Sequence, residues 1–213
     1  MSRTSRRAVI AGAGALAASQ ALAQTPATAP AAAPAAPVRP QVTLSTPQGD
    51  IVVELAQDKA PITCANFLRY VDAHRFNNAS FYRAVKVLPQ PLTGLLQGGI
   101  KNDPKRSYPP IAHESTTQTG LSNRDGAISM ARYAPGSACS EFFICVGDDS
   151  SLDADPKQSG DNAGFAVFGH VVGGMDVVQK ILLGPVSATK GADSGMVGQM
   201  LDPEVAITTT KRS

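Results

Sequence analysis

An arginine and a glutamine set among aromatic residues are the side chains of this 213-residue chain best suited to chemistry. Arg83 directly follows Phe81 and Tyr82, Gln97 precedes two glycines, and Phe143 lies in a second aromatic segment. No histidine, cysteine or carboxylate is positioned among them as an obvious nucleophile or base. A permanently charged guanidinium beside apolar surface suits a reaction that makes and breaks no stable covalent bond, because it can act by hydrogen bonding alone.

Five short segments around these residues carry a resemblance to a known family. They are FYRAV at 81–85, QGG at 97–99, GAISMAR at 126–132, SEFFI at 140–144 and AVFG at 166–169. In this order they resemble the cyclophilin family of peptidyl-prolyl cis/trans isomerases, and the resemblance covers about residues 41–212. It implies an isomerase that needs no cofactor and acts on proline-containing segments of client proteins.

The reaction that the resemblance implies has a physical need for an arginine. Resonance in the X–Pro amide raises the barrier to rotation to ~18–20 kcal/mol, so a catalyst must favour the twisted amide over both planar forms. Twisting makes the prolyl nitrogen pyramidal and returns its lone pair. Arg83 matches the family's arginine, and its guanidinium could donate a hydrogen bond to that nitrogen.

The resemblance also implies which residues hold the substrate. Gln97 matches the glutamine that hydrogen-bonds the peptide backbone, and Ala131 and Arg132 match the strand whose backbone pairs with the peptide. Phe165 stands where the family carries a histidine or a tyrosine. The apolar pocket for the proline ring is implied at Phe143, Leu95 and Leu152.

The chain departs from the family pattern at the pocket. An insertion at 88–93 widens the spacing between the matched arginine and glutamine. Gly94 stands where the family has a pocket phenylalanine, so one aromatic ring is missing. A leucine of the insertion, Leu88 or Leu92, could fold back and fill that space.

Three neighbours of the matched residues need an interpretation. Glu141 replaces a glutamine of the substrate-binding set, and its negative charge could either orient Arg83 or hold it away from substrate. Tyr82 replaces a common family histidine and is expected to be structural. Phe142 and Phe143 are adjacent on a predicted strand and therefore point to opposite faces, so one of them belongs to the core.

Each assignment has a simpler alternative that the residues alone leave open. Arg83 could be a surface ion-pair partner, and Gln97 could begin a turn before the two glycines. Leu152 and Phe165 could be ordinary core residues. The resemblance favours the site roles of Arg83 and Gln97, which lie within the ordered motifs, and leaves both readings open for Leu152 and Phe165.

The elements that must position these residues are mostly short strands. Proline and glycine at 46–49 predict a hairpin turn between the first two strands. Pro61 suits the first turn of a helix. Strands are predicted at 42–45, 51–55, 80–88, 95–98, 127–132, 141–146, 165–171 and 205–210, and helices at 61–73 and 175–183.

These elements predict the class of fold. Strands and helices do not alternate regularly, which disfavours a doubly wound parallel sheet, and 19 Gly and 16 Pro disfavour an all-helical chain. We therefore expect a mainly β protein, a closed eight-stranded antiparallel β-barrel capped by two α-helices, as in cyclophilins. The Gly-, Ser- and Asp-rich stretch 148–163 predicts a long surface loop.

The first 40 residues have the character of an export leader and a linker. Arg6 and Arg7 precede an apolar run in a twin-arginine pattern, and small residues favour cleavage after Ala23. The run is too short to span ~30 Å of hydrocarbon, which disfavours an uncleaved anchor. We expect a periplasmic protein with a signal peptide at 1–23, an Ala/Pro-rich disordered tether at 24–40 and a cyclophilin-like domain at 41–213.

Charge and cysteine content limit the other functions. Removing the three leader arginines from the net charge of +2 leaves −1, and the absence of a basic run argues against a nucleic-acid partner. We expect a mature monomer without a membrane span. Cys64, Cys139 and Cys145 show no Cys-x-x-Cys spacing, so we expect buried or half-buried thiols, no metal site and no redox function. The main alternative is a weakly active or inactive peptide-binding module.

Overall fold

The computed structural model describes residues 39–87 and 92–213. The predicted signal peptide, most of the predicted tether and residues 88–91 of the insertion lie outside the described residues. Pro40, which was assigned to the tether, already contacts the domain, because its C=O accepts a hydrogen bond from the Leu55 N–H at 2.9 Å. The first strand follows directly, at Gln41.

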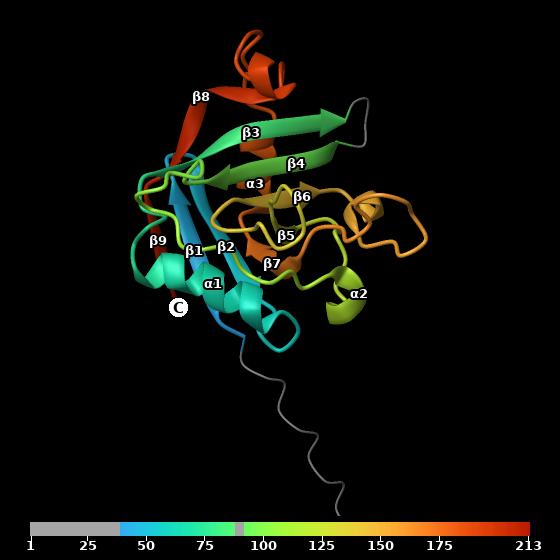
Figure 1. Ribbon diagram of the computed structural model, residues 1–213. Helices are drawn as coiled ribbons and strands as arrows, with labels where there is room; N and C mark the ends of the chain where they lie inside the picture. Colours follow the sequence, from blue (N-terminus) through green and yellow to red (C-terminus); the bar gives the residue numbers. More distant parts are fainter. Residues whose placement is uncertain (1–38, 88–91) are drawn as a thin grey trace, which may run out of the picture. The chain divides into compact units, whose positions relative to one another are not determined.

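Nine strands form one antiparallel sheet that rolls into a nearly closed barrel (Figure 1). Their order around the barrel is β8-β3-β4-β6-β5-β7-β2-β1-β9. The strands are β1 (Gln41–Thr46), β2 (Gly49–Leu55), β3 (Ala79–Val87), β4 (Thr93–Gly99), β5 (Ala127–Met130), β6 (Phe142–Val146), β7 (Val167–Gly173), β8 (Met200–Ile207) and β9 (Thr209–Arg212).

The two outermost strands of the sheet, β8 and β9, are nearly continuous in the chain. β8 pairs with β3 and β9 pairs with β1, although only Thr208 separates the two strands. The Thr208 N–H donates to the Ser45 C=O at 2.8 Å, which bends the chain from one edge of the sheet to the other. Nine strands replace the expected eight because this bend divides one predicted strand, and the mainly β antiparallel barrel is confirmed.

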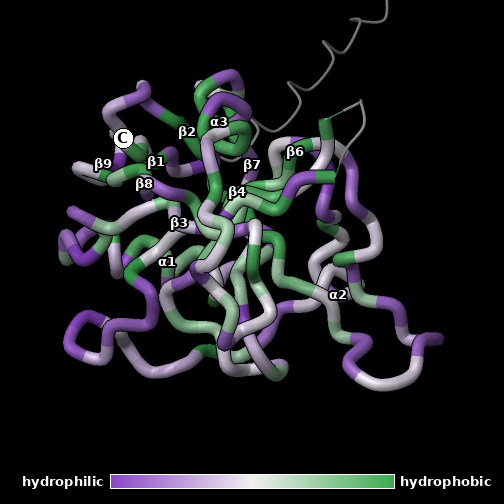
Figure 2. The backbone as a smooth tube through the Cα atoms, turned by 90° about the horizontal axis from the view of Figure 1, so that it is seen from above, coloured by the Kyte–Doolittle hydropathy of each residue, from purple (hydrophilic) through white to green (hydrophobic). Residues whose placement is uncertain are grey.

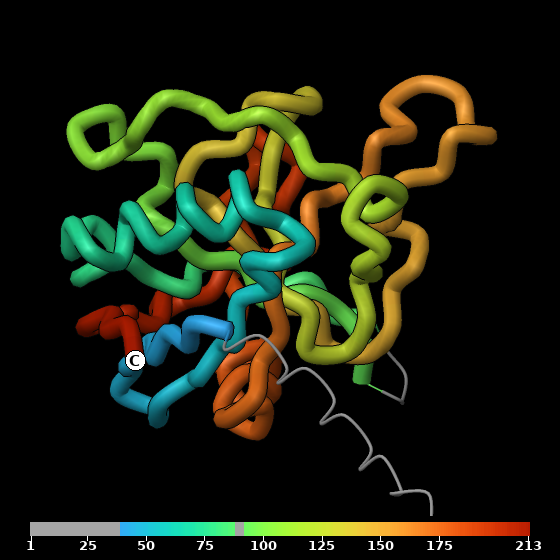
Figure 3. The backbone as a smooth tube through the Cα atoms, turned by 90° about the horizontal axis from the view of Figure 1, so that it is seen from below, coloured from blue at the N-terminus to red at the C-terminus, as the bar shows by residue number. Residues whose placement is uncertain are grey.

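Two longer helices pack against opposite ends of the barrel. α1 (Pro61–Asp72) follows the end of β2 and begins at Pro61, as predicted (Figure 3). α3 (Met175–Leu182) packs Val177 beside Gly49, in the hairpin turn at the other end of β2. The structure also contains the one-turn α2 (Thr116–Thr119), which was not predicted because a single turn has no measurable period.

The barrel interior is filled by rings that α1 and the strands contribute together. Phe67 of α1 lies 5.5 Å from Phe142 and 5.1 Å from Phe168, measured between ring centroids. Phe76 adds a further contact with Phe67 at 5.2 Å. Figure 2 shows that the hydrophilic stretches run mainly through the peripheral loops, so the apolar residues are concentrated on the strands and helices.

The segment before β8 differs from the prediction. β8 begins at Met200 rather than 205, and the short 3-10 helix η2 (Ala192–Ser194) precedes it. Val186 forms an isolated bridge with Leu201, which ties this segment to the strand. The early start was missed because exposed polar residues and a proline at 202–204 interrupt the apolar alternation that marks a strand. None of the helices in the described ranges is long and apolar enough to cross a membrane.

Candidate active site

Arg83, Gln97 and Phe143 form a row across three adjacent strands. Arg83 lies opposite Gln97 in the β3–β4 pair, and Gln97 lies opposite Phe143 in the β4–β6 pair. Because side chains alternate along a strand, the next row must face the other way. That next row is buried in the barrel core and consists of Ala84, Leu96 and Ile144. The row of Arg83 therefore lies on the outer face of the barrel.

A β-bulge at Tyr82 changes the direction of the side chains at this point. Phe81 pairs with Gly98 and Arg83 pairs with Gln97, so Tyr82 is an extra residue with no partner of its own on β4. Bulges re-aim side chains and are frequent beside active sites. Here the bulge lets Tyr82 and Arg83, although adjacent, both hydrogen-bond to Gln97.

The guanidinium of Arg83 is held at two of its nitrogens. Its Nη1 donates to Gln97 Oε1 at 2.9 Å, and its Nε donates to Gln199 Oε1 at 2.8 Å. The side chain is half-buried, and this partial desolvation lowers the pKa of the guanidinium. A charge with less surrounding water makes stronger hydrogen bonds to whatever group it meets.

Tyr82 and Glu141 fix the orientation of the Gln97 amide. The Tyr82 hydroxyl donates to Glu141 Oε2 at 2.6 Å and accepts from Gln97 Nε2 at 2.8 Å. A carboxylate can only accept and a guanidinium can only donate, so Gln97 must turn its oxygen to Arg83. Burial and the neighbouring Glu141 raise the pKa of Tyr82, which keeps its hydroxyl available as a donor.

Glu141 is buried, and it affects Arg83 only indirectly, through other side chains. Its carboxylate also accepts hydrogen bonds from the Ser140 hydroxyl at 3.0 Å and from the Asn102 N–H at 3.1 Å. Among the described residues, no ion pair joins Glu141 to Arg83. Of the two roles left open by the sequence, these bonds fit the one that orients the arginine, through Tyr82 and Gln97.

The five apolar residues proposed for the substrate site share one cluster that is distinct from the barrel core. Phe143 is buried, and its ring meets that of Phe165 edge to face with centroids 5.4 Å apart. The Phe165 N–H donates to the Leu152 C=O at 2.9 Å, which brings the long loop onto the strand. The residues brought together are Phe143, Leu95, Ala131, Leu152 and Phe165.

Arg132 fixes the end of the long loop through its side chain. Its Nη1 donates to Asp161 Oδ2 at 2.6 Å and its Nε to the Gly164 C=O at 2.9 Å. The guanidinium carbon lies 5.1 Å from the centroid of the Phe165 ring. Within the part of the chain that the structure describes, the Arg132 backbone N–H and C=O have no hydrogen-bond partner, as pairing with a peptide would require.

Gly94 leaves no room for the missing pocket ring. Its φ is +151°, and a Cβ atom there would lie 1.9 Å from the Val85 C=O oxygen. Leu92, one of the two leucines considered as a replacement, packs against the barrel core instead, and Leu88 lies outside the described residues. The backbone conformation at position 94 therefore excludes a phenylalanine side chain there.

We expect Gly94→Ala to destabilise the protein by about 2 kcal/mol or more, because a Cβ there meets backbone and the φ angle disfavours L-residues. For a domain of this size, that is a fall in Tm of about 4–8 °C. The matched control is Gly173→Ala on β7, where a Cβ makes only an ordinary contact with Val52 at 3.6 Å. Equal melting temperatures for the two variants would contradict the steric explanation.

Comparison with known proteins identifies the family. Residues 41–209 match the family model described as "Cyclophilin type peptidyl-prolyl cis-trans isomerase/CLD". The chain belongs to the cyclophilin family. A peptidyl-prolyl cis-trans isomerase of Acinetobacter baylyi is 38% identical over 147 residues, which are 68% of this chain and 73% of that protein. Isomerase B of Escherichia coli is 38% identical over 167 residues, 76% of this chain and 90% of that protein.

Solved structures support the same fold for this cyclophilin. A Cryptosporidium parvum cyclophilin type isomerase superimposes with a TM-score of 0.62 at 21% identity, covering 83% of this chain and 98% of that chain. A second crystal structure with that description, in the presence of the dipeptide Ala-Pro, gives a TM-score of 0.61 at 21% identity, covering 80% and 96%. The predicted enzyme class, a peptidyl-prolyl cis-trans isomerase, is confirmed by the family match.

Two residues of the network were not found by sequence reasoning. Tyr82 was expected to be structural, yet it links Gln97 to Glu141, and only the bulge, which leaves no sequence signal, makes this possible. Gln199 carries no sequence signal either. It lies in a turn-rich segment without apolar periodicity, so nothing in the sequence connects it with Arg83.

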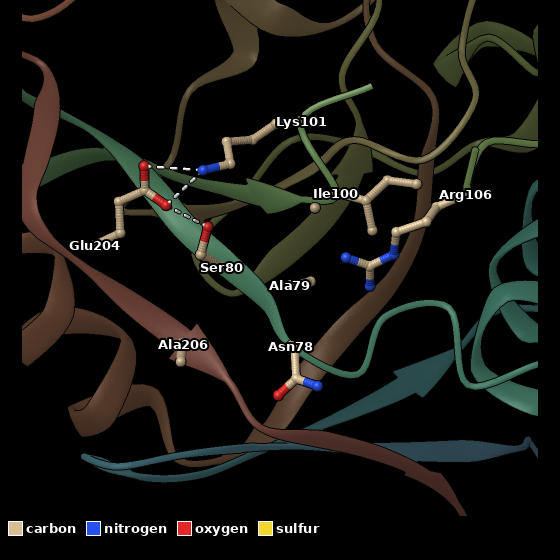
Figure 4. A pocket seen from close by; sticks show the side chains of 9 residues that line it. Asn78, Ala79, Ser80, Ile100, Lys101, Arg106, Glu204 and Ala206 are labelled. Atoms are coloured by element: carbon tan, nitrogen blue, oxygen red, sulfur yellow. Dashed lines mark hydrogen bonds and ion pairs between the residues drawn. The ribbon is translucent and has the colours of Figure 1, made fainter. Parts of the chain in front are cut away.

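A hollow of about 250 Å³ lies away from this row, beside β3 and β8 (Figure 4). Its polar groups bind one another: Glu204 accepts from Lys101 Nζ at 2.9 Å and from Ser80 at 2.7 Å. Arg106 points into the hollow and donates to the Asn77 C=O at 2.7 Å. Because these groups are already paired, the hollow is a weaker candidate site than the row of Arg83.

The cysteines of this cyclophilin are separate thiols, as expected. Cys64 and Cys145 are buried, Cys139 is half-buried, and all three are free. Burial raises the pKa of Cys64 and of Cys145 to about 12, so neither is an activated thiolate. The described residues contain no group of His, Cys, Asp and Glu that could hold a metal ion.

We expect these thiols to make the protein less stable in alkali. Above pH ~9 the unfolded chain loses thiol protons that the folded chain keeps, so the free energy of unfolding falls by up to about 1.4 kcal/mol per pH unit for each thiol. Urea unfolding between about pH 8 and pH 10.5 measures this slope. Replacing both Cys64 and Cys145 by alanine should flatten it, and an unchanged slope would contradict the assignment.

Proposed function

We propose that this cyclophilin accelerates rotation about X–Pro bonds by stabilising the twisted amide with Arg83. The observation that carries the proposal is the row of Arg83, Gln97 and Phe143 on neighbouring strands. At ~4.8 Å per strand, the row spans roughly 10 Å. A peptide segment of two or three residues covers that length, so one proline and its neighbours could meet all three side chains.

The apolar cluster, the peptide-binding groups and Arg83 are proposed to have different roles, which follow from their chemistry. The cluster around Phe143 receives the proline ring. Burial of apolar surface is non-directional, so it contributes binding affinity but does not favour the twisted amide over the planar forms. Gln97 and the backbone of Arg132 hold the peptide on either side. Arg83 donates to the pyramidal prolyl nitrogen, a stronger acceptor than the planar amide nitrogen, so its bond favours the transition state over both ground states.

Substrates of this site are proposed to be proline-containing segments of other proteins. The presence of the dipeptide Ala-Pro in a structure of the related Cryptosporidium parvum isomerase supports this class of ligand. A protease-coupled assay on a short Ala-Pro-Phe peptide tests it, because the protease cleaves only the trans isomer. An isomerisation rate no higher than that of the uncatalysed peptide would overturn the proposal.

The protein is further proposed to act in the periplasm on exported proteins. The support is the twin-arginine pattern at Arg6 and Arg7 and the small residues before the predicted cleavage after Ala23. Fusion of residues 1–40 to a reporter enzyme tests export. The wild-type fusion should reach the periplasm, and a fusion carrying Arg6→Lys and Arg7→Lys should remain in the cytoplasm.

A peptide-binding module with little turnover is the second candidate, and Gly94 is the observation that favours it. Without the pocket phenylalanine, the apolar cluster offers less surface to a proline ring. NMR titration with a proline-containing peptide separates the two functions. Exchange cross-peaks between the cis and trans forms indicate catalysis, whereas shift changes without such peaks indicate binding alone.

A further inference from the structure

The geometry points to Gln199 as a positioning residue that sets the direction in which Arg83 presents its free hydrogen-bond donors. This inference rests on the proposed catalytic role of Arg83. Gln199 does not need to touch the substrate. It acts through the guanidinium, because its Oε1 accepts from Arg83 Nε at 2.8 Å.

Two hydrogen bonds fix the orientation of the planar Arg83 guanidinium, whereas one hydrogen bond would not. A guanidinium carries five N–H donors in one rigid plane. Gln97 alone would hold Arg83 at Nη1 and leave the plane free to turn about that bond. The second bond, from Nε to Gln199, removes this freedom. Among the described residues Nη2 has no partner, so its two N–H groups are left for the prolyl nitrogen and the adjoining carbonyl.

The backbone of Gln199 is itself docked next to Arg83. Its C=O accepts a hydrogen bond from the Ala84 N–H at 2.7 Å, and its N–H donates to the Met196 C=O at 3.1 Å. The amide therefore extends from a fixed point directly beside the arginine's own strand. Within the described residues, the Gln199 side chain makes no hydrogen bond other than the one with Arg83.

The two glutamines also differ in what they are free to do. Gln97 is bound at both ends of its amide, by Arg83 and by Tyr82, and it lies between the arginine and the apolar cluster. A peptide that bonds to Gln97 competes with these contacts. Gln199 approaches Arg83 from the β8 side, away from the cluster, and can keep its bond while substrate is bound.

The test is a set of variants at position 199 with both kinetic and spectroscopic readouts. Gln199→Met keeps the length and removes the acceptor, and we expect kcat to fall about five- to tenfold with KM unchanged. Gln199→Glu keeps an acceptor oxygen and should retain most of the activity. Gln179→Met, at an exposed position on α3, is the matched control and should have wild-type activity.

An NMR readout separates this inference from the catalytic proposal. The Arg83 Nε–H should exchange slowly with water in the wild type and in Gln199→Glu, and faster in Gln199→Met, whether or not the protein catalyses isomerisation. If Gln199→Met does not fold, Gln199→Asn, which is too short to reach Nε, takes its place. Unchanged Nε–H exchange in Gln199→Met would overturn the inference, as would equal losses of activity in the Met and Glu variants. Faster exchange with an unchanged kcat would support the positioning by Gln199 and count against the catalytic role proposed for Arg83.

Discussion

Arg83→Ala is expected to lower the kcat of peptide isomerisation at least tenfold, which corresponds to about 1.4 kcal/mol or more of lost transition-state stabilisation. The reason is that the bond from the guanidinium to the prolyl nitrogen strengthens only as the amide twists. KM should change much less, because the apolar cluster proposed to bind the proline ring is left intact. Protease-coupled kinetics on an Ala-Pro-Phe peptide measure both constants.

Arg83→Lys is the informative control for this prediction. Lysine keeps the positive charge but lacks the planar fork, so it cannot bond to Gln97 and Gln199 and still present a third nitrogen to substrate. We therefore expect it to lose nearly as much activity as alanine. Full activity in Arg83→Lys would mean that charge alone suffices, and full activity in Arg83→Ala would remove the proposed mechanism.

Phe143→Ala is expected to raise KM about tenfold or more and to lower the free energy of unfolding by about 3 kcal/mol. Phe143 is 3% exposed and packs edge to face on Phe165, so its removal opens a cavity and disrupts the apolar cluster proposed to receive the proline ring. Peptide kinetics and urea unfolding of the same preparation measure the two effects.

Phe142 supplies a matched control on the same strand. It is fully buried in the barrel core, on the opposite face from Phe143. Phe142→Leu should therefore cost stability and leave KM unchanged, whereas Phe143→Leu should raise KM at a smaller cost in stability. A rise in KM of the same size in both variants would show that the substrate does not distinguish the two faces of β6.

Local patterns in the sequence were enough to predict the strands of the barrel, and the family resemblance predicted which residues form the candidate site. Alternating runs located the strands, and their order in the chain placed Arg83, Gln97 and Phe143 on three of them. The apolar residues matched by the family resemblance share one cluster, because family motifs preserve spatial neighbours that are distant in sequence. The motifs thus predicted which side chains meet without predicting the bonds between them.

The remaining features depend on backbone irregularities that side-chain patterns do not report. The bulge at Tyr82 breaks the alternation rule, so a residue expected to be structural joins the hydrogen-bond network. Gln199 reaches Arg83 from a turn-rich segment whose position depends on contacts with distant parts of the chain, including the pairing between β3 and β8. Glu141 illustrates the same limit, since its charge was evident in the sequence but its three hydrogen-bond donors were not.

The bent terminal strand has a consequence for how the protein is made. Ribosomes produce the chain from its amino end, so Arg83 leaves the exit tunnel long before its partner Gln199. Phe81 on β3 likewise lacks its pairing partner on β8, Val205, until that residue has been made. A nascent chain that ends before Gln199 lacks the β3–β8 pairing, and it also lacks the hydrogen bond from Arg83 to Gln199. A premature stop codon at position 199 or earlier should therefore yield an inert polypeptide rather than a partly working enzyme.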